Sequence, residues 1–126
     1  TGIGNDLYDN VKSLSRILGP ATDAFSMYDE MLEAIVKHVS KDNLILLSYG
    51  PTATILAYDL AKLGYWAIDI GHLDIEYEWF LQKATDSVAV KGKFTNENKQ
   101  GHFVEDCIDQ TYLSQIIYDI TKDIAK

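Results

Sequence analysis

The chain has 126 residues, of which 47% are hydrophobic and 24% charged, and these proportions are ordinary for a single globular domain. Its formal net charge of −8 argues against nucleic acid or an anionic membrane as the main partner, because both attract basic surfaces. No apolar run approaches the length of about 20 residues that spans a bilayer, and the single cysteine rules out an internal disulfide, which fits a reducing, cytoplasmic setting.

The chain opens on a glycine-rich turn, Gly2-Ile3-Gly4-Asn5-Asp6, without an initiator methionine, so we expect a fragment or a processed chain. Glycine permits a positive φ, and Asn5 or Asp6 can cap a short helix expected over residues 7–12. Amides at the start of that helix could meet a phosphate or a ribose. A plain capped turn explains the same residues.

Strand and helix patterns then alternate three times. The run Leu44-Ile45-Leu46-Leu47 is apolar without alternation, which is typical of strands buried on both faces in parallel sheets. The predicted strand and helix pairs are 15–18 with 23–39, 43–48 with 52–63, and 65–70 with 73–84. This order predicts an α/β fold, a Rossmann-like parallel sheet with helices on both faces and right-handed crossovers.

The second strand is followed by the turn Tyr49-Gly50-Pro51-Thr52, and Pro51 suits a first helical position. Such a strand–turn–helix is where α/β folds bind phosphates. The turn lacks both a Walker lysine and a G-x-G-x-x-G pattern, so hydroxyls of Thr52 and Thr54 and free helix amides are its candidate ligand groups. In a parallel sheet this turn and the end of the third strand open on the same edge.

The segment Gly71-His72-Leu73-Asp74-Ile75-Glu76-Tyr77-Glu78-Trp79-Phe80 gathers one imidazole and three carboxylates. Its polar residues alternate as in a strand, but a helical stripe over the longer window accounts for more apolar residues. We therefore predict a helix beginning near Asp74, with Asp74 and Glu78 on one face and His72 in the preceding loop.

These residue types permit three kinds of chemistry. Imidazole and carboxylate oxygens suit Mn²⁺ or Mg²⁺, and a carboxylate near an acceptor hydroxyl can act as a general base. In a purely structural role, Asp74 caps the helix while Glu76 and Glu78 are solvated. The residues alone favour the structural role.

The remainder of the chain has weaker patterns. Residues 87–90 could form a strand, 92–101 read as a polar loop centred on Asn96-Glu97-Asn98, and 102–104 could form a brief strand. A final helix is predicted over 110–125. Its apolar positions recur at helical spacing: Leu113, Ile116, Ile117, Ile120 and Ile124.

Three of these motifs resemble the signature of the GT-D-type glycosyltransferases, bacterial enzymes of which some glycosylate surface adhesins. They are Ala67-Ile68-Asp69-Ile70 with the 71–80 segment, Gly50-Pro51-Thr52-Ala53-Thr54 with residues 56–60, and Gly2-Ile3-Gly4-Asn5-Asp6-Leu7. The resemblance covers nearly the whole chain but only the C-terminal half of such an enzyme, because the family's N-terminal Asp-x-Glu metal motif has no counterpart here. It implies that residues 1–126 form a single domain, the C-terminal portion of a glycosyltransferase domain.

The resemblance also implies roles for residues. Glu78 looks like the base that activates an acceptor hydroxyl of a glycan or glycoprotein, which would invert the anomeric centre, and His72 looks like a contact to Mn²⁺ (or Mg²⁺) or to the diphosphate. Three further carboxylates would support the site residues or cap the helix: Asp69, Asp74 and Glu76. The donor is expected to be a nucleoside diphosphate sugar such as UDP-glucose, and the missing N-terminal half is an expected partner. The implied nucleotide-sugar contacts are Gly4, Asn5, Asp6, Gly50, Pro51, Thr52, Thr54, Asn96 and Glu97, with Asn98 departing from the family's pattern.

Two other functions stay open. One is a nucleotide-binding module without turnover, which the absent metal motif favours. The other is a metal-dependent phosphohydrolase on the same parallel sheet, because a fold does not fix a function.

Overall fold

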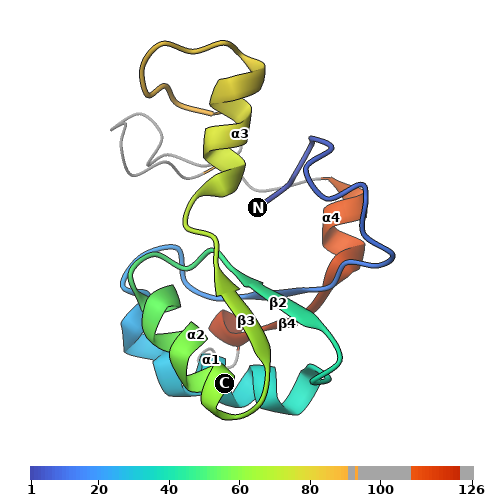
Figure 1. The fold of residues 1–126 in the computed structure, drawn as a ribbon, viewed down its shortest axis with the longest axis vertical. Coiled ribbons are helices and arrows are strands. Elements are labelled where there is room, and N and C mark those ends of the chain that lie inside the picture. The colour runs from blue at the N-terminus through green and yellow to red at the C-terminus, as the bar shows by residue number, and fades with distance from the viewer. Residues whose placement is uncertain (91–92, 94–108, 123–126) are drawn as a thin grey trace. The chain divides into compact units, whose positions relative to one another are not determined.

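The computed structural model describes residues 1–90, 93 and 109–122 (Figure 1). Its helices and strands, in chain order, are β1 (Arg16–Leu18), η1 (Ala24–Met27), α1 (Tyr28–His38), β2 (Leu44–Leu47), α2 (Thr52–Lys62), β3 (Trp66–Asp69), α3 (Leu73–Leu81), α4 (Gln110–Gln115), β4 (Ile116–Asp119) and η3 (Ile120–Lys122). The chain divides into two compact units. The sheet unit comprises Ser15–Gly71 and Ile116–Lys126, and the α3 unit comprises Thr1–Leu14 and His72–Gln115.

All strand pairs in the sheet unit are parallel among the described residues. β2 pairs with β3 in a continuous register from Leu44 opposite Trp66 to Leu47 opposite Asp69. β1 pairs with β4, with one irregularity between Arg16 and Ile17. The predicted α/β class with parallel strands is therefore confirmed, as are the three strand–helix pairs to within a few residues at their ends.

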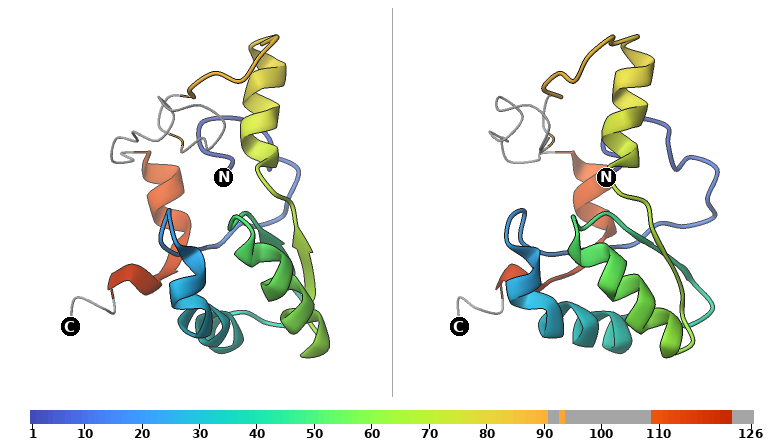
Figure 2. Two further views of the ribbon diagram at one scale, coloured as in Figure 1. Left: turned by 90° about the vertical axis from the view of Figure 1, so that its left-hand side faces the viewer. Right: turned by 60° about the vertical axis from the view of Figure 1, so that its left-hand side comes forward.

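The core of the sheet unit lies between the strands and two helices. In the left view of Figure 2, α1 and α2 lie on one side of β3. Leu56 and Leu60 of α2 are fully buried there, because residues four apart share one face of a helix. The other buried apolar residues of this cluster are Met27, Met31, Ala34, Ile35, Leu47, Ala53, Tyr65 and Ile120.

Helix α1 starts later than the predicted bound at residue 23. Asp23 has a φ of 51° and makes no side-chain capping bond. Its backbone oxygen instead accepts a 3.1 Å hydrogen bond from the amide of Ser26, and the single turn η1 precedes the α-helix. The helix thus begins at Tyr28 rather than at residue 23.

Two short elements predicted in the α3 unit do not form. Residues 7–12 make turns, with bonds from Asp9 N to Asp6 O and from Val11 N to Tyr8 O, because so short a helix cannot offset its nucleation cost. Residues 87–90 are not a strand. There the carbonyl of Val88 accepts a 2.9 Å hydrogen bond from the indole of Trp79, which takes the place of a ladder partner.

The predicted C-terminal helix over 110–125 is wrong for residues 116–119, and residues 123–125 lie outside the described residues. Helix α4 ends at Gln115 and the chain continues directly as β4. The sequence Ile116-Ile117-Tyr118 consists of β-branched and aromatic residues, which favour a strand, and β4 gains a parallel ladder with β1. The predicted strand 102–104, and the loop 92–101 apart from Lys93, lie outside the described residues.

The helix predicted near Asp74 is confirmed as α3, which begins at Leu73. In the described part of the chain, no helix has the length and apolar character needed to cross a bilayer.

Candidate functional site

The carboxyl ends of β2 and β3 meet at one corner of the sheet unit. The amide of Ile70 donates to the carbonyl of Leu47 over 2.9 Å, which continues the pairing one residue past the end of β3. The hydroxyl of Thr54, in the first turn of α2, donates to Oδ2 of Asp69 over 2.9 Å. The structure therefore brings the Gly50–Thr54 turn and the end of β3 together, as the parallel arrangement predicted.

Two glycines in the left-handed region shape this corner. Gly50 and Gly71 have φ values of 54° and 55°, and a Cβ added at either would meet no heavy atom within 4 Å. Gly71 is held by its neighbours, since its amide donates to Oδ1 of Asp69 and its carbonyl accepts from the hydroxyl of Ser48. The two turns are thus fixed in place and open to solvent at their glycines.

The start of α2 supplies this corner with helix dipole and backbone groups. Pro51 precedes the helix, Ala53 donates its amide to Gly50 O over 3.1 Å, and the side chain of Thr54 faces Asp69. The partial positive charge of a helix N-terminus favours anions. Thr52 is buried, so its hydroxyl is not at the surface, whereas Gly50, Pro51 and Thr54 are exposed.

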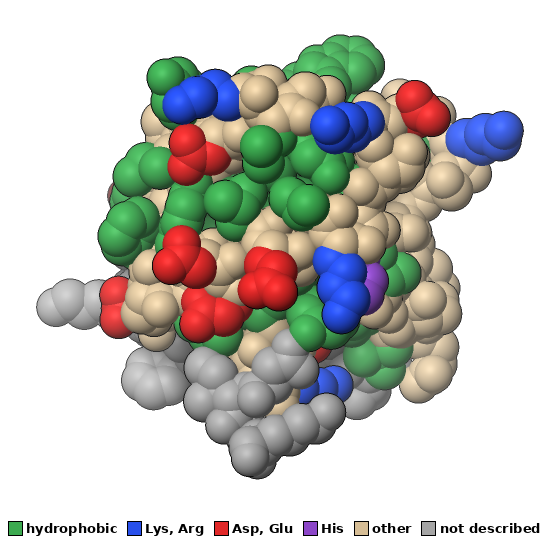
Figure 3. All heavy atoms as spheres, turned by 90° about the horizontal axis from the view of Figure 1, so that it is seen from below, with side chains coloured by type: hydrophobic (Ala, Val, Ile, Leu, Met, Phe, Trp, Pro, Cys, Tyr) green, Lys and Arg blue, Asp and Glu red, His purple; other side chains and the backbone are tan. Residues whose placement is uncertain are grey.

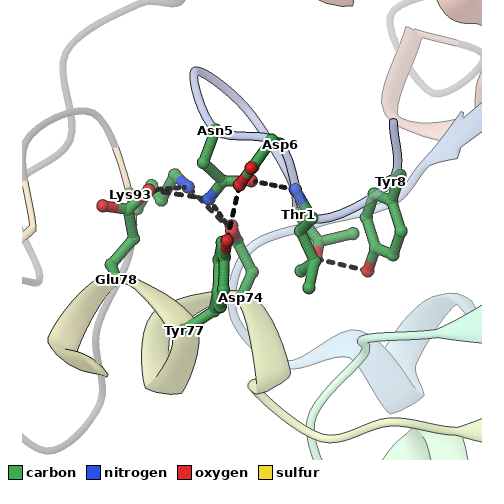
Figure 4. Close-up of polar contacts among 9 residues, drawn as sticks. Thr1, Asn5, Asp6, Tyr8, Asp74, Tyr77, Glu78 and Lys93 are labelled. Carbon is green, nitrogen blue, oxygen red and sulfur yellow. Dashed lines mark hydrogen bonds and ion pairs between the residues drawn. The ribbon is translucent and has the colours of Figure 1, made fainter. Parts of the chain in front are cut away.

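In the α3 unit, two carboxylates are held by an amide and an ammonium group (Figure 4). The side-chain nitrogen of Asn5 donates to Oδ1 of Asp74 over 2.8 Å and to Oε1 of Glu78 over 2.7 Å. Lys93 Nζ reaches the same two oxygens, at 2.8 Å and 3.1 Å. Asp74 and Glu78 share a face of α3 because they are four residues apart. We call these four residues the Asn5 cluster.

The Asn5 cluster has an excess of negative charge. Two carboxylates and one ammonium sum to −1 at neutral pH. Burial alone would raise the pKa of Asp74, but the hydrogen bonds from Lys93 and Asn5 outweigh it and hold that pKa below its ordinary value. Asp74 therefore stays ionised although it is only 4% exposed.

The N-terminal turn is attached to α3 at a second point. The hydroxyl of Tyr77 donates to Oδ1 of Asp6 over 2.5 Å, and this bond raises the pKa of Tyr77 (Figure 4). Asn5 uses its side-chain oxygen to accept from the amide of Leu7 over 3.1 Å. Asn5 and Asp6, two of the predicted ligand contacts, are thus bonded to the helix that carries Glu78.

His72 lies at the N-cap of α3 and does not join the Asn5 cluster. Its Nδ1 is 3.6 Å from Oε1 of Glu76, and its ring centroid is 6.3 Å from that of Trp79. About half of the His72 side chain is exposed. The expectation that Asp74 caps the helix is wrong, because Asp74 is one residue inside it and bonds to Asn5 and Lys93.

The described residues alone do not complete a metal centre. Among them, no group of three or more His, Cys, Asp or Glu side chains is arranged to hold a metal ion. His72, about half exposed, could supply one donor. Oδ1 of Asp74 and Oε1 of Glu78 are bonded to the ammonium group of Lys93 instead.

The opposite face of α3 borders an open hollow of about 570 Å³. Glu76 and Phe80 line it from α3, four residues apart, together with Trp79, and Lys83 and Asp86 line it from the segment after the helix. Glu76 therefore faces away from the Asn5 cluster, so it provides a matched comparison for Glu78 on the same helix.

Lys93 was missed by the sequence analysis. It stands within the segment predicted as a polar loop, where no local pattern distinguishes it from any surface lysine. The available signal was indirect: Asp74 and Glu78 on one helix face need a counter-charge if they are buried. Asn96 and Glu97 lie outside the described residues, so their predicted contacts stay predictions.

Comparison with known proteins places these features in a family. The sequence profile described as "Glycosyltransferase GT-D fold" matches residues 1–98. The chain is 40% identical over 123 residues to a probable glycosyl transferase, Gly, of Streptococcus gordonii, and 41% identical over 117 residues to the glycosyltransferase GlyD of Streptococcus pneumoniae. These matches cover 98% and 93% of the chain but 18% and 14% of the two relatives.

A solved structure has the same fold. The structure titled a new glycosyltransferase (DUF1792) from Streptococcus sanguinis superimposes with a TM-score of 0.81 at 40% sequence identity. The superposition covers 94% of this chain and 44% of that one. The chain therefore spans less than half of the solved domain and under a fifth of the two streptococcal relatives.

Proposed function

Because this chain belongs to the family of glycosyltransferases with the GT-D fold, we propose that it forms part of an enzyme that transfers a sugar from a nucleoside diphosphate donor to an acceptor hydroxyl. The donor we propose is UDP-glucose, and the acceptor is a hydroxyl of a glycan or glycoprotein. The remainder of the enzyme corresponds to the part of the fold that this chain does not span. A reducing, cytoplasmic setting is supported by the single cysteine.

The observation that carries this proposal is the way Glu78 is held. Two donors, Asn5 and Lys93, converge on its Oε1, while the side chain remains 17% exposed. A general base must be fixed in orientation and still reachable by the hydroxyl whose proton it removes. Glu78 meets both requirements, whereas Asp74, one turn earlier in α3, is more deeply buried.

In the reaction we propose, Glu78 accepts the proton of the acceptor hydroxyl as its oxygen attacks the anomeric carbon. The new C–O bond forms while the bond from that carbon to the diphosphate breaks, and the diphosphate leaves with the electron pair. Attack opposite the leaving group inverts the anomeric centre. Lys93 and Asn5 hold Glu78 in place before the attack.

The corner at the ends of β2 and β3 is our candidate for the donor's phosphates. Gly50, Pro51 and Thr54 are exposed there at the start of α2, whose dipole favours an anion, and Thr52 would contribute through its backbone. Gly4, Asn5 and Asp6 remain candidate donor contacts. For Asn5 and Asp6 the role would be mainly to position α3, since their side chains already bond to it.

We propose that a divalent cation, Mn²⁺ or Mg²⁺, assists the reaction, although the described residues supply only part of its ligands. When bound, it would neutralise the leaving diphosphate. Within the described residues His72 offers one ligand, so the further ligands would have to come from elsewhere in the enzyme. We derive no step through the cation.

A nucleotide-binding module without turnover is the second candidate. It is favoured by the lack of a three-residue metal cluster among the described residues. Such a module needs the phosphate corner but not Glu78.

Isothermal titration calorimetry with UDP and GDP, each with and without Mn²⁺, tests the proposal on the chain itself. We expect UDP to bind, to bind more tightly with Mn²⁺, and to lose the Mn²⁺ effect in His72→Ala. His38→Ala is the matched control, because His38 lies in α1 and stacks on Tyr118 within the sheet unit.

The alternatives give other results. UDP binding that is indifferent to Mn²⁺ and to His72→Ala supports the module. Release of inorganic phosphate from many phosphate esters indicates a phosphohydrolase and contradicts the transferase. No binding of either nucleotide overturns the assignment of the phosphate corner to this chain.

A further inference from the structure

One face of the β2–β3 sheet exposes large apolar side chains. Trp66 is 65% exposed, Leu44 is 44% exposed and Ile68 is 39% exposed. The parallel register sets Leu44 beside Trp66 and Leu46 beside Ile68. We call these four residues the Trp66 face.

The Trp66 face lies opposite the helices of the sheet unit. Side chains alternate between the two faces of a strand, and the residues between these four, Ile45 and Ala67, pack against the core that contains Leu56 of α2. In the left view of Figure 2, α2 and α1 lie on one side of β3. The face that carries Trp66 is therefore the second side of a parallel sheet.

Exposure of this kind is unusual for a parallel sheet. Such sheets occur almost only with both faces covered by helices, because each crossover places a helix against the sheet. Contiguous apolar surface on a soluble protein commonly marks a contact with another polypeptide. Figure 3, a view from below, shows hydrophobic side chains exposed among charged ones, so exposure alone does not identify the partner.

The comparison with solved structures indicates the occupant. The chain aligns over 94% of its length with the Streptococcus sanguinis domain but accounts for only 44% of that domain. More than half of the fold is thus contributed by polypeptide that has no equivalent in this chain. A second copy of this chain would leave that half of the fold unaccounted for.

We propose that the Trp66 face binds an amphipathic helix from the part of the GT-D fold that this chain does not span. The size fits, because two strands about 4.8 Å apart offer a strip about as wide as one helix, roughly 10 Å in diameter. Four residues of strand extend about 13 Å, which matches a helix of two to three turns. Trp66 lies at the start of β3 and is the largest group on this face. The inference concerns assembly and does not depend on the proposed transfer reaction.

The experiment co-expresses this chain with the portion of the Streptococcus sanguinis domain that lies outside the match, and measures association by sedimentation. The chain has two tryptophans, so Trp79→Phe leaves Trp66 as its single tryptophan. We expect a one-to-one complex in which Trp66 emission shifts to the blue relative to the free chain. Acrylamide quenching of the complex, measured with that portion's own tryptophans replaced, is expected to fall severalfold.

Trp66→Glu is expected to weaken the complex at least tenfold. Tyr58→Glu is the matched control, because Tyr58 is 64% exposed but lies on α2, on the other side of the sheet. Both variants change exposed residues, and thermal unfolding verifies that each is folded. If Trp66→Glu does not fold, the milder substitutions Leu44→Gln and Ile68→Asn are used in its place.

Three results overturn the proposal. One is a complex that Trp66→Glu and Tyr58→Glu weaken equally. The second is no association of the two portions although both are folded. The third is a homodimer of this chain that Trp66→Glu abolishes, because the occupant is then a second copy. The titration with nucleotides is a separate measurement on this chain alone. Failure of the association proposal can therefore be distinguished from failure of the proposed function.

Discussion

The Nζ atom of Lys93 lies 2.8 Å from Oδ1 of Asp74, and both side chains are more than nine-tenths removed from solvent. A buried charge is tolerated only with a partner, and removal of one partner leaves the other uncompensated. Lys93 also reaches Glu78, so its loss leaves two carboxylates facing each other.

Replacement of Lys93 by Met therefore destabilises the α3 unit. We expect a loss of about 3–5 kcal/mol in the free energy of unfolding, measured by urea denaturation. Lys122→Met is the control, because the Lys122 side chain is 80% exposed and its nitrogen is 3.8 Å from Asp119, so its loss is expected to cost less than about 1 kcal/mol. Equal effects of the two substitutions would contradict the ion-pair assignment.

Acid weakens the same cluster in a definite direction. The pKa of Asp74 is lower in the folded chain than its ordinary value of 3.8. Its stabilising effect is therefore fully present above that value and is lost as the pH falls through the folded pKa. We expect Asp74→Asn to be less stable than the native chain at pH 6, and the gap to shrink progressively below about pH 4.

Urea denaturation of the two proteins at matched ionic strength between pH 3 and pH 6 provides this comparison. Glu76→Gln is the control, since Glu76 is outside the Asn5 cluster. A gap between Asp74→Asn and the native chain that stays constant over this range would contradict the lowered pKa.

The side chain of Asn5 ties the N-terminal turn to α3. Asn5→Ala removes two donors from carboxylates, and hydrogen bonds to charged groups contribute about 1.5–3 kcal/mol each. We expect a loss on the order of 2 kcal/mol or more, together with faster amide exchange in residues 1–14. Asn10→Ala, at an exposed position of the same turn region, is expected to change stability by less than about 0.5 kcal/mol. Similar losses in both variants would mean that Asn5 does not anchor the turn.

The C-terminal segment is part of the core of the sheet unit. Ile120 is 1% exposed, so Ile120→Ala is expected to cost about 2–5 kcal/mol. Ile117 is 46% exposed, and Ile117→Ala removes the same atoms from β4 at a cost we expect to be below about 1.5 kcal/mol. Thermal or urea unfolding compares them, and equal costs would contradict the burial of Ile120.

The elements between Arg16 and Leu81 were predictable because their signals are local. The run Leu44-Ile45-Leu46-Leu47 and the Pro51 turn each favour one conformation within a short window, and the apolar spacing of α3 favours a helix over a longer one; the structure follows all three. Their parallel pairing followed from the alternation of strand and helix alone.

The C-terminal strand was not predictable in this way. Ile116, Ile117 and Ile120 fit a helical spacing as well as a strand, and the pairing of β4 with β1 joins segments a hundred residues apart. A partner so distant in sequence leaves no trace in a local pattern. The strand is favoured over the helix by pairing with β1, which exists only in the folded chain.

The candidate site was predictable in part. Glu78 and Asp74 were placed on one face by their spacing, which the structure confirms. Their partners were not, because Asn5 is 69 residues from Asp74 and Lys93 follows from no motif. Glu78 was expected to be solvated in the structural role, but it is mostly buried and bonds to Lys93 and Asn5.

The most direct test of the proposed function compares two carboxylates of α3 in an enzyme that contains this chain. With UDP-glucose and an acceptor glycan, Glu78→Gln is expected to lower kcat by about 10²–10⁴-fold and to leave UDP binding within threefold. Glu76→Gln, on the opposite face of the helix, is expected to retain kcat within threefold. If the folded Glu78→Gln enzyme transferred glucose at the native rate, Glu78 would not be the base and the proposed mechanism would be wrong.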